Sequence, residues 1–248
     1  MESFKNKIAV ITGGNSGIGY ATAKELKAKG ATVIITGRRL EAVERAAADL
    51  DVVGIVSDQS SVEQTEQLVI RIKEKYGKVD MLLINAGIVG TSLIEQATET
   101  FFDSIMDINF KGAYFTLSRF IPELNDGASV VFLSSNTANM NGAQSSIYSS
   151  SKAALNSVMR IAAVELAPRG IRVNSVSPGP TKTEILNKLG MDEAARQAID
   201  EWMIERIPLK KIGSADDVAK MVAYFFGDTA SFITGGEIIM DGGMSLVG

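Results

Sequence analysis

Short apolar segments rich in β-branched residues alternate with longer segments of helical spacing along the whole chain. The pattern predicts strands at residues 7–12, 31–36, 52–57, 79–84, 128–134, 171–177 and 236–240. It predicts helices between them, including 39–50, 60–76, 147–167 and 214–226. Strands this apolar are buried on both faces, which requires a parallel sheet with helices on both sides. We therefore expect an α/β fold with a doubly wound sheet of about seven strands.

The chain shows no linker, repeat, low-complexity tract or shift in composition that would mark a domain boundary. We therefore expect residues 1–248 to form a single domain. The longest interval without a predicted strand is 178–213, and an interval this long is usually functional. We expect a partly helical substrate lid at about residues 181–212.

Histidine and cysteine are both missing from the sequence. This excludes the common catalytic zinc ligands and the usual Ser-His and Cys-His nucleophile pairs, so we expect no metal site. Proton transfer near neutral pH must then use tyrosine, lysine or a carboxylate. The lack of cysteine also fits a reducing compartment.

The charge pattern and the apolar runs limit the possible partners and location. The chain has 25 basic and 29 acidic side chains, and it offers no basic run longer than a pair such as Arg38-Arg39, so nucleic acid is not expected as a partner. No run approaches the roughly 20 apolar residues that span a bilayer, and the first residues do not resemble a secretion signal. We expect a cytoplasmic protein that does not enter a membrane.

A glycine-rich turn at residues 12–19 separates the first predicted strand from the first predicted helix. Glycines allow a sharp turn and a close approach to a ligand, and the helix start offers free N–H groups to a pyrophosphate. The spacing G-x-x-x-G-x-G differs from the usual dinucleotide fingerprint, so a plain turn is the alternative. The cofactor-binding residues expected here are Gly13, Asn15, Ser16, Gly17, Ile18 and Gly19.

The second predicted strand is followed by Gly37, Arg38 and Arg39. A carboxylate at this point would bind the ribose hydroxyls of NAD, whereas arginine pairs with the extra phosphate of NADP. The alternative is that the two arginines only begin a solvated helix. We expect NADP(H) as the preferred cofactor, with NAD(H) possible.

Tyr148 and Lys152 are four residues apart in a segment of helical spacing, so they share one face. Spacing alone is weak evidence, because Tyr20 and Lys24 have the same spacing and are expected to form a surface pair. Tyr148, however, follows a buried strand that ends near Ser135. This order can return the tyrosine to the carboxyl edge of the sheet, where open α/β folds bind ligands.

The chain resembles the short-chain dehydrogenase/reductase family over nearly its whole length, especially bacterial ketone/alcohol and 3-oxoacyl reductases. The matching elements are TGGNSGIG at 12–19, NAG at 85–87, Asn109, Ser135, Tyr148, Lys152, PGPTKT at 178–183 and DGG at 241–243. The resemblance implies a Rossmann-type fold and hydride transfer between a nicotinamide cofactor and a carbonyl or alcohol.

The resemblance implies four catalytic residues. Tyr148 exchanges a proton with the substrate oxygen, and Ser135 hydrogen-bonds that oxygen. Lys152 holds the nicotinamide ribose and lowers the tyrosine pKa from its ordinary value of about 10. Asn109 supports a water that links the lysine to solvent.

The resemblance also implies further cofactor contacts. Asp58 should meet the adenine, and the segment Asn85, Ala86 and Gly87 should let the adenosine side pass closely. The nicotinamide site should be shaped by Pro178, Gly179, Thr181 and Thr183.

Three functions are weighed, of which reduction of a small ketone or oxidation of a secondary alcohol is preferred. Substrate choice is assigned to the loop 136–146 and the lid, whose apolar residues either line a pocket or pack the lid onto the body. A 3-oxoacyl-[acyl-carrier-protein] reductase is the alternative. Its carrier protein is acidic, so such a reductase should have basic residues at the mouth of its pocket. Segment 123–127 is acidic to neutral, and we take this as evidence against the alternative. A non-catalytic NADP(H)-binding sensor or scaffold is the third, which the Ser135, Tyr148 and Lys152 set argues against.

The helix predicted at 147–167 carries many small residues that permit close packing with another helix. These residues are Ser149, Ser150, Ala153, Ala154 and Ser157. The family resemblance implies a homotetramer built partly on such helices.

Overall fold

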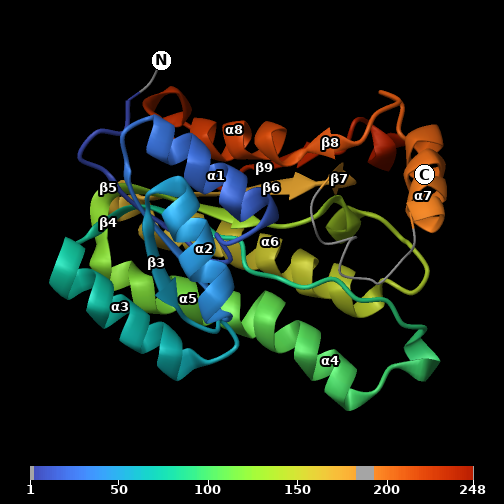
Figure 1. The fold of residues 1–248 in the computed structure, drawn as a ribbon, viewed down its shortest axis with the longest axis horizontal. Helices are drawn as coiled ribbons and strands as arrows, with labels where there is room; N and C mark the ends of the chain where they lie inside the picture. The colour runs from blue at the N-terminus through green and yellow to red at the C-terminus, as the bar shows by residue number, and fades with distance from the viewer. Residues whose placement is uncertain (1–2, 183–192, 248) are drawn as a thin grey trace.

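Seven parallel strands form one sheet in the computed structural model, which describes residues 3–182 and 193–247 (Figure 1). The strands are β1 (Ile8–Ile11), β2 (Thr32–Gly37), β3 (Val53–Val56), β4 (Val79–Ile84), β5 (Leu124–Leu133), β6 (Arg172–Pro178) and β9 (Glu237–Met240). Their order is β3-β2-β1-β4-β5-β6-β9, and every neighbouring pair is parallel. The predicted doubly wound, seven-stranded sheet is confirmed.

Helices cover both faces of this sheet (Figure 1). Their bounds are α1 (Gly17–Ala28), α2 (Leu40–Leu50), α3 (Val62–Tyr76), α4 (Glu99–Met106), α5 (Ala113–Phe120), α6 (Ser146–Leu166), α7 (Glu193–Arg206) and α8 (Ala215–Phe226). Side chains of α3, α5 and α6 build the core on one face, and side chains of α1 and α8 build the core on the other.

Strand β1 shows why the predicted strands are apolar at nearly every position. Ala9, Val10 and Ile11 are all fully buried. Val10 packs into the core beneath α3, α5 and α6, whereas Ala9 and Ile11 pack into the core beneath α1 and α8. Successive strand residues face opposite sides, so a central strand between two helix layers needs apolar side chains on both.

Two details of the sheet differ from the prediction. Strand β5 begins at Leu124, where it pairs with Val79 of β4, and the register shifts before the regular pairing resumes. The interval 178–213 contains β7 (Thr181–Lys182), and β8 (Gly213–Ser214) begins at its end; these two strands form a separate small sheet. Strands of two residues carry no periodicity that a sequence could reveal.

Helix α7 lies within the interval predicted as a lid, and residues 183–192 of that interval lie outside the described residues. Within the described part of the chain, no helix combines the length and apolar character needed to cross a bilayer.

Candidate active site

A cleft of about 1480 Å³ opens at the carboxyl ends of the strands. The strand order reverses between β1 and β4, and ligands of open α/β sheets bind outside such a point. Among the predicted site residues the cleft is lined by Gly13, Asn15, Ser16, Gly17, Ile18, Arg38, Arg39, Asp58, Asn85, Ala86, Gly87, Ser135, Tyr148, Lys152, Pro178, Gly179 and Thr181. Gly19 and Asn109 lie behind its wall, and Thr183 lies outside the described residues.

The glycines of the turn after β1 are required by the backbone. Gly13 and Gly17 have φ of +66° and +57°, a region that favours glycine. A Cβ on Gly19 would lie 2.4 Å from the carbonyl oxygen of Gly13, so the first turn of α1 packs directly on the loop. Helix α1 has no acidic residue in its first turn, and its amino end faces the cleft. The arrangement suits a pyrophosphate.

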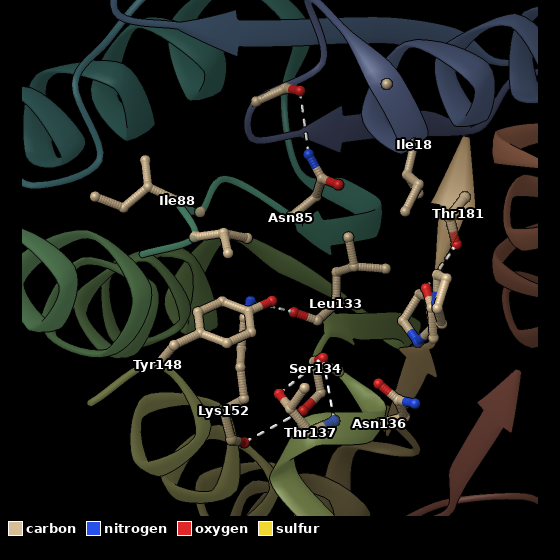
Figure 2. Close-up of a pocket in the computed structure, with 18 of the residues that line it drawn as sticks. Ile18, Asn85, Ile88, Leu133, Ser134, Asn136, Thr137, Tyr148, Lys152 and Thr181 are labelled. Carbon is tan, nitrogen blue, oxygen red and sulfur yellow. Dashed lines mark hydrogen bonds between the residues drawn. The ribbon is translucent and has the colours of Figure 1, made fainter. Parts of the chain in front are cut away.

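Asn85 supports this turn from the end of β4. Its side-chain nitrogen donates to the carbonyl oxygens of Thr12, at 2.8 Å, and Gly13, at 3.1 Å (Figure 2). The hydroxyl oxygen of Thr12 in turn accepts from the backbone N–H groups of Asn85 and Ala86, at 2.9 and 3.1 Å. Sequence reasoning did not assign Thr12 a role, although its hydroxyl directly precedes the glycines.

The end of β2 places two cations at the cleft. Arg38 and Arg39 are exposed, line the cleft, and form no ion pair with any described residue. Gly37 leaves room for the neighbouring loop, because its Cβ would lie 2.4 Å from Asn15 Oδ1. Arg39 is also the N-cap residue of α2, but its side chain makes no capping hydrogen bond.

The end of β3 contributes a carboxylate held by its own loop. Asp58 Oδ1 accepts from the backbone N–H and the hydroxyl of Ser60, at 3.0 and 2.8 Å. The backbone N–H of Asp58 donates to Gln64 Oε1. The next residue, Gln59, is buried and bonds to two other elements of the site; sequence reasoning missed it.

Lys152 is almost completely buried, with 4% of its surface exposed. Its ammonium donates to the carbonyl oxygen of Leu133, the last residue of β5, at 2.8 Å (Figure 2). The same Nζ lies 5.9 Å from the centre of the Tyr148 ring. The shared helical face thus brings both side chains to the carboxyl end of β5.

The second tyrosine-lysine pair has a different environment. The hydroxyl of Tyr20 donates to the carboxylate of Asp49 on α2, and Lys24 is exposed. The expected surface pairing of Tyr20 with Lys24 is therefore replaced by a contact between two helices.

Ser135 begins the short 3-10 helix Asn136–Asn139 as its N-cap. Its hydroxyl oxygen accepts from the backbone N–H of Thr137, at 3.3 Å, and from the Thr137 hydroxyl, at 3.0 Å (Figure 2). Ser134 donates from its hydroxyl to the carbonyl oxygen of Lys152, at 3.2 Å, which fastens α6 to the end of β5.

Asn109 is fully buried in a π-helical turn, Asp107–Gly112, between α4 and α5. Its Oδ1 accepts from the backbone N–H of Ile88 at 2.8 Å, and its Nδ2 donates to the Ile88 carbonyl at 2.9 Å and to Ser151 Oγ at 3.3 Å. Single π turns inside helices occur often at functional sites. These contacts fix the chain after β4, and the predicted support of a water stays a prediction.

Burial dominates the ionisation of the two central groups. It raises the pKa of Tyr148, and a side-chain hydrogen bond with Ser135 acts in the opposite direction. It lowers the pKa of Lys152 to about 8. The direction for Tyr148 is opposite to the lowering expected from the sequence, because desolvation of the phenolate outweighs the favourable contacts.

The outer part of the cleft is lined by apolar side chains from five segments. These are Val89, Met140, Trp202, Met203, Ile212, Met244 and Val247. The apolar residues expected in the lid are Leu186, Leu189, Met191, Trp202, Met203 and Ile204. Trp202 and Met203 line the cleft, Ile204 is not among its lining residues, and Leu186, Leu189 and Met191 lie outside the described residues. The contribution of Met244 and Val247 was not predicted.

The residues present fit a dinucleotide. A Cβ on Gly87 would lie 3.2 Å from Asn109 Oδ1 and 3.4 Å from Lys152 Nζ, so a side chain there would crowd both groups. The close approach at Gly87, the glycine turn, the amino end of α1 and the two exposed arginines together define a dinucleotide-binding α/β protein of the Rossmann class.

Comparisons with known proteins agree with this class. A family model described as Enoyl-(Acyl carrier protein) reductase matches residues 13–245. Tropinone reductase-like 3 of Erythroxylum coca is 34% identical over 97% of this chain and 93% of its own length. Dehydrogenase/reductase SDR family member 4 of Homo sapiens is 34% identical over 96% of this chain and 87% of its own length. The solved structure of levodione reductase superposes with a TM-score of 0.93 at 31% identity, covering 99% of this chain and 100% of that chain.

The chain belongs to the short-chain dehydrogenase/reductase family and is an NAD(P)-dependent oxidoreductase.

The lowered pKa of Lys152 predicts a pH dependence of stability. Between pH 8 and 10.5 the unfolded lysine still holds its proton while the folded one loses it, so the unfolded state binds more protons and stability rises with pH. Relative to Lys152→Met, the wild type should gain up to about 3 kcal/mol over this window. Urea unfolding of both proteins at several pH values measures the difference; a constant difference would contradict the lowered pKa.

Proposed function

We propose that this protein is an NADP(H)-dependent ketone reductase and secondary-alcohol dehydrogenase in which Tyr148 is the general acid and base. The observation that carries the proposal is the placement of the Tyr148 ring beside the buried Lys152 ammonium, 5.9 Å from the ring centre, at the wall of a dinucleotide cleft. Ser135 lines the same cleft, and its hydroxyl acts to lower the pKa of Tyr148, against the effect of burial.

When bound, the nicotinamide supplies or accepts the hydride. In reduction, the carbonyl carbon gains that hydride and the Tyr148 hydroxyl gives its proton to the carbonyl oxygen. Ser135 donates a hydrogen bond to the same oxygen as charge develops there. The raised pKa of Tyr148 keeps the phenol protonated at neutral pH, which favours its role as acid.

In the oxidising direction, Tyr148 must accept the proton of the alcohol as a phenolate. The neighbouring Lys152 ammonium stabilises that phenolate, and the carbonyl of Leu133 holds the ammonium in place. Because burial raises the tyrosine pKa, oxidation should become faster relative to reduction as pH rises toward about 8, above which Lys152 loses the proton that stabilises the phenolate.

The experiment is NADPH oxidation measured with simple aryl and cyclic ketones, in the wild type and in Tyr148→Phe. Loss of the acid should lower kcat about 10²- to 10⁴-fold while NADPH binding persists. Tyr20→Phe is the matched control, because Tyr20 also precedes a lysine by four residues but its hydroxyl donates to Asp49 on α2. Full activity in Tyr148→Phe would refute the proposal.

NADP(H) is proposed as the preferred cofactor because Arg38 and Arg39 are exposed at the cleft without a partner among the described residues. A guanidinium pairs with a phosphate in a bidentate fork.

Removing this charge should change cofactor preference more than turnover. In Arg38→Ala/Arg39→Ala, kcat/KM for NADPH should fall roughly 10- to 100-fold, the effect of losing one or two charge-assisted hydrogen bonds, while that for NADH changes little. Steady-state kinetics with both cofactors measures the ratio. Equal losses for the two cofactors would show that the arginines do not read the phosphate.

A hydrophobic ketone or secondary alcohol is the proposed substrate class. The apolar outer wall of the cleft supports it, and so do the names tropinone reductase-like 3 and levodione reductase borne by two similar proteins.

A 3-oxoacyl thioester on acyl carrier protein is the second candidate. The argument against it from segment 123–127 fails, because this segment lies at the amino end of β5, whereas the cleft lies at the carboxyl end. Lys182 and Arg206 line the cleft and favour an acidic carrier, but Asp200 and Glu205 line it as well. Turnover of an acetoacetyl thioester in preference to ketones would select this candidate, and cofactor binding without turnover of any carbonyl would select a sensor.

A homotetramer is the proposed assembly. The residues Ser150, Ala153, Ser157, Ile161 and Val164 form an exposed stripe on α6 at a spacing of three or four residues. Ile161 and Val164 are 56% and 75% exposed, although both are apolar. A solution mass of one chain, by light scattering, would refute the assembly.

We also propose that the protein acts in the cytoplasm, because a chain without cysteine fits a reducing compartment.

A further inference from the structure

Gln59 connects two parts of the site that lie far apart in the sequence. It follows Asp58 in the loop after β3, and only 8% of its surface is exposed. Its side-chain nitrogen donates to the carbonyl oxygen of Ala86, at 2.9 Å, and to that of Ile108, at 3.0 Å. Ala86 belongs to the segment after β4, and Ile108 directly precedes Asn109 in the π turn.

The backbone of Gln59 contacts the far end of the same π turn. A Cβ on Gly112 would lie 2.2 Å from the Gln59 carbonyl oxygen, so only glycine allows the turn to approach this closely. The loop after β3 therefore contacts the π turn at both of its ends, through Ile108 and through Gly112.

Hydrogen bonds continue from the π turn to the catalytic helix. Asn109 binds both backbone groups of Ile88 and donates to Ser151. The Ser151 hydroxyl donates to the carbonyl oxygen of Tyr148 at 2.6 Å. The path from Gln59 thus reaches the backbone of the proposed acid, and Figure 2 shows Ile88 and Tyr148 on neighbouring walls of the cleft.

Gln59 carries out this bridging at a cost to stability. Its Oε1 is buried and has no hydrogen-bond partner among the described residues. Rotating the amide would not help, because its oxygen would then face the carbonyl oxygens of Ala86 and Ile108. A buried unpaired acceptor is unfavourable, and an apolar side chain of the same size would avoid it. The two donated hydrogen bonds are therefore what the amide specifically provides.

We propose that Gln59 is a positioning residue that couples the adenosine end of the cleft to Asn109 and the catalytic helix. It fixes the π turn against the segment after β4, so that the Asn109 side chain meets the backbone of Ile88. The inference rests on the proposed function, which assigns the cleft to the cofactor and Tyr148 to the proton transfer.

Gln59→Leu tests this role, because it keeps the volume and removes both donors. We expect kcat to fall roughly 10- to 100-fold, the effect of a small misplacement of reacting groups, while the KM for the cofactor changes less than the kcat. The thermal midpoint should fall slightly, because the carbonyl oxygens of Ala86 and Ile108 lose their donor, although removal of the unpaired oxygen offsets part of that loss. Gln59→Asn is a second variant, for use if Gln59→Leu does not fold. Its shorter side chain cannot donate to the carbonyl oxygens of both Ala86 and Ile108, so its kcat should also fall.

Gln64→Leu is the matched control. Gln64 lies in the first turn of α3, and its side chain accepts from the Asp58 backbone N–H, away from the π turn. Its replacement should raise the KM for the cofactor and leave the exchange of the Ile88 amide unchanged.

Hydrogen exchange of the Ile88 amide gives a readout independent of activity, because this N–H donates to Asn109. It should accelerate in Gln59→Leu and not in Gln64→Leu. Unchanged exchange and unchanged kcat in Gln59→Leu would overturn the inference and leave the proposed function intact. A wild type without turnover of any carbonyl would instead contradict the proposed function, while the exchange rates would still decide the coupling.

Discussion

The site depends on a buried ammonium held by the end of a strand. Lys152 is almost fully buried, and a charge in such a position is costly unless it is hydrogen-bonded. The carbonyl oxygen of Leu133 is free to accept because β5 ends there, and it lies 2.8 Å from Nζ. This bond, with that between Ser134 and the Lys152 carbonyl, sets α6 on the sheet and so determines where Tyr148 meets the cleft.

The same principle applies around the cleft, where hydrogen bonds at strand ends hold the loops that meet the cofactor. Asn85 and Thr12 lock the glycine turn to the end of β4. Asn109 locks the chain at Ile88. Several residues that a motif marks as functional therefore act by holding backbone. Arg38 and Arg39, which are exposed, and Tyr148, which is partly buried, line the cleft and are the groups we propose to meet ligands.

The sequence predicted what local patterns control. The strands were predictable because residues such as Ala9, Val10 and Ile11 are buried on alternate faces, and the glycine turn because Gly13 and Gly17 need positive φ. It could not predict Gln59, because its partners Ala86 and Ile108 are close only in the fold. The pKa of Tyr148 was misjudged for a similar reason: burial depends on the whole cleft, whereas the spacing to Lys152 is local. Met244 and Val247 reach the cleft through a chain end that no periodicity marks.

The central claim is that a carbonyl carbon receives a hydride in this cleft while Tyr148 protonates its oxygen. The most direct test uses NADPH deuterated at C4 of the nicotinamide, with a ketone that the protein turns over and mass analysis of the alcohol. The account predicts one deuterium on the carbinol carbon and none on oxygen after exchange in water. An unlabelled alcohol, formed with either C4 position deuterated, would contradict it.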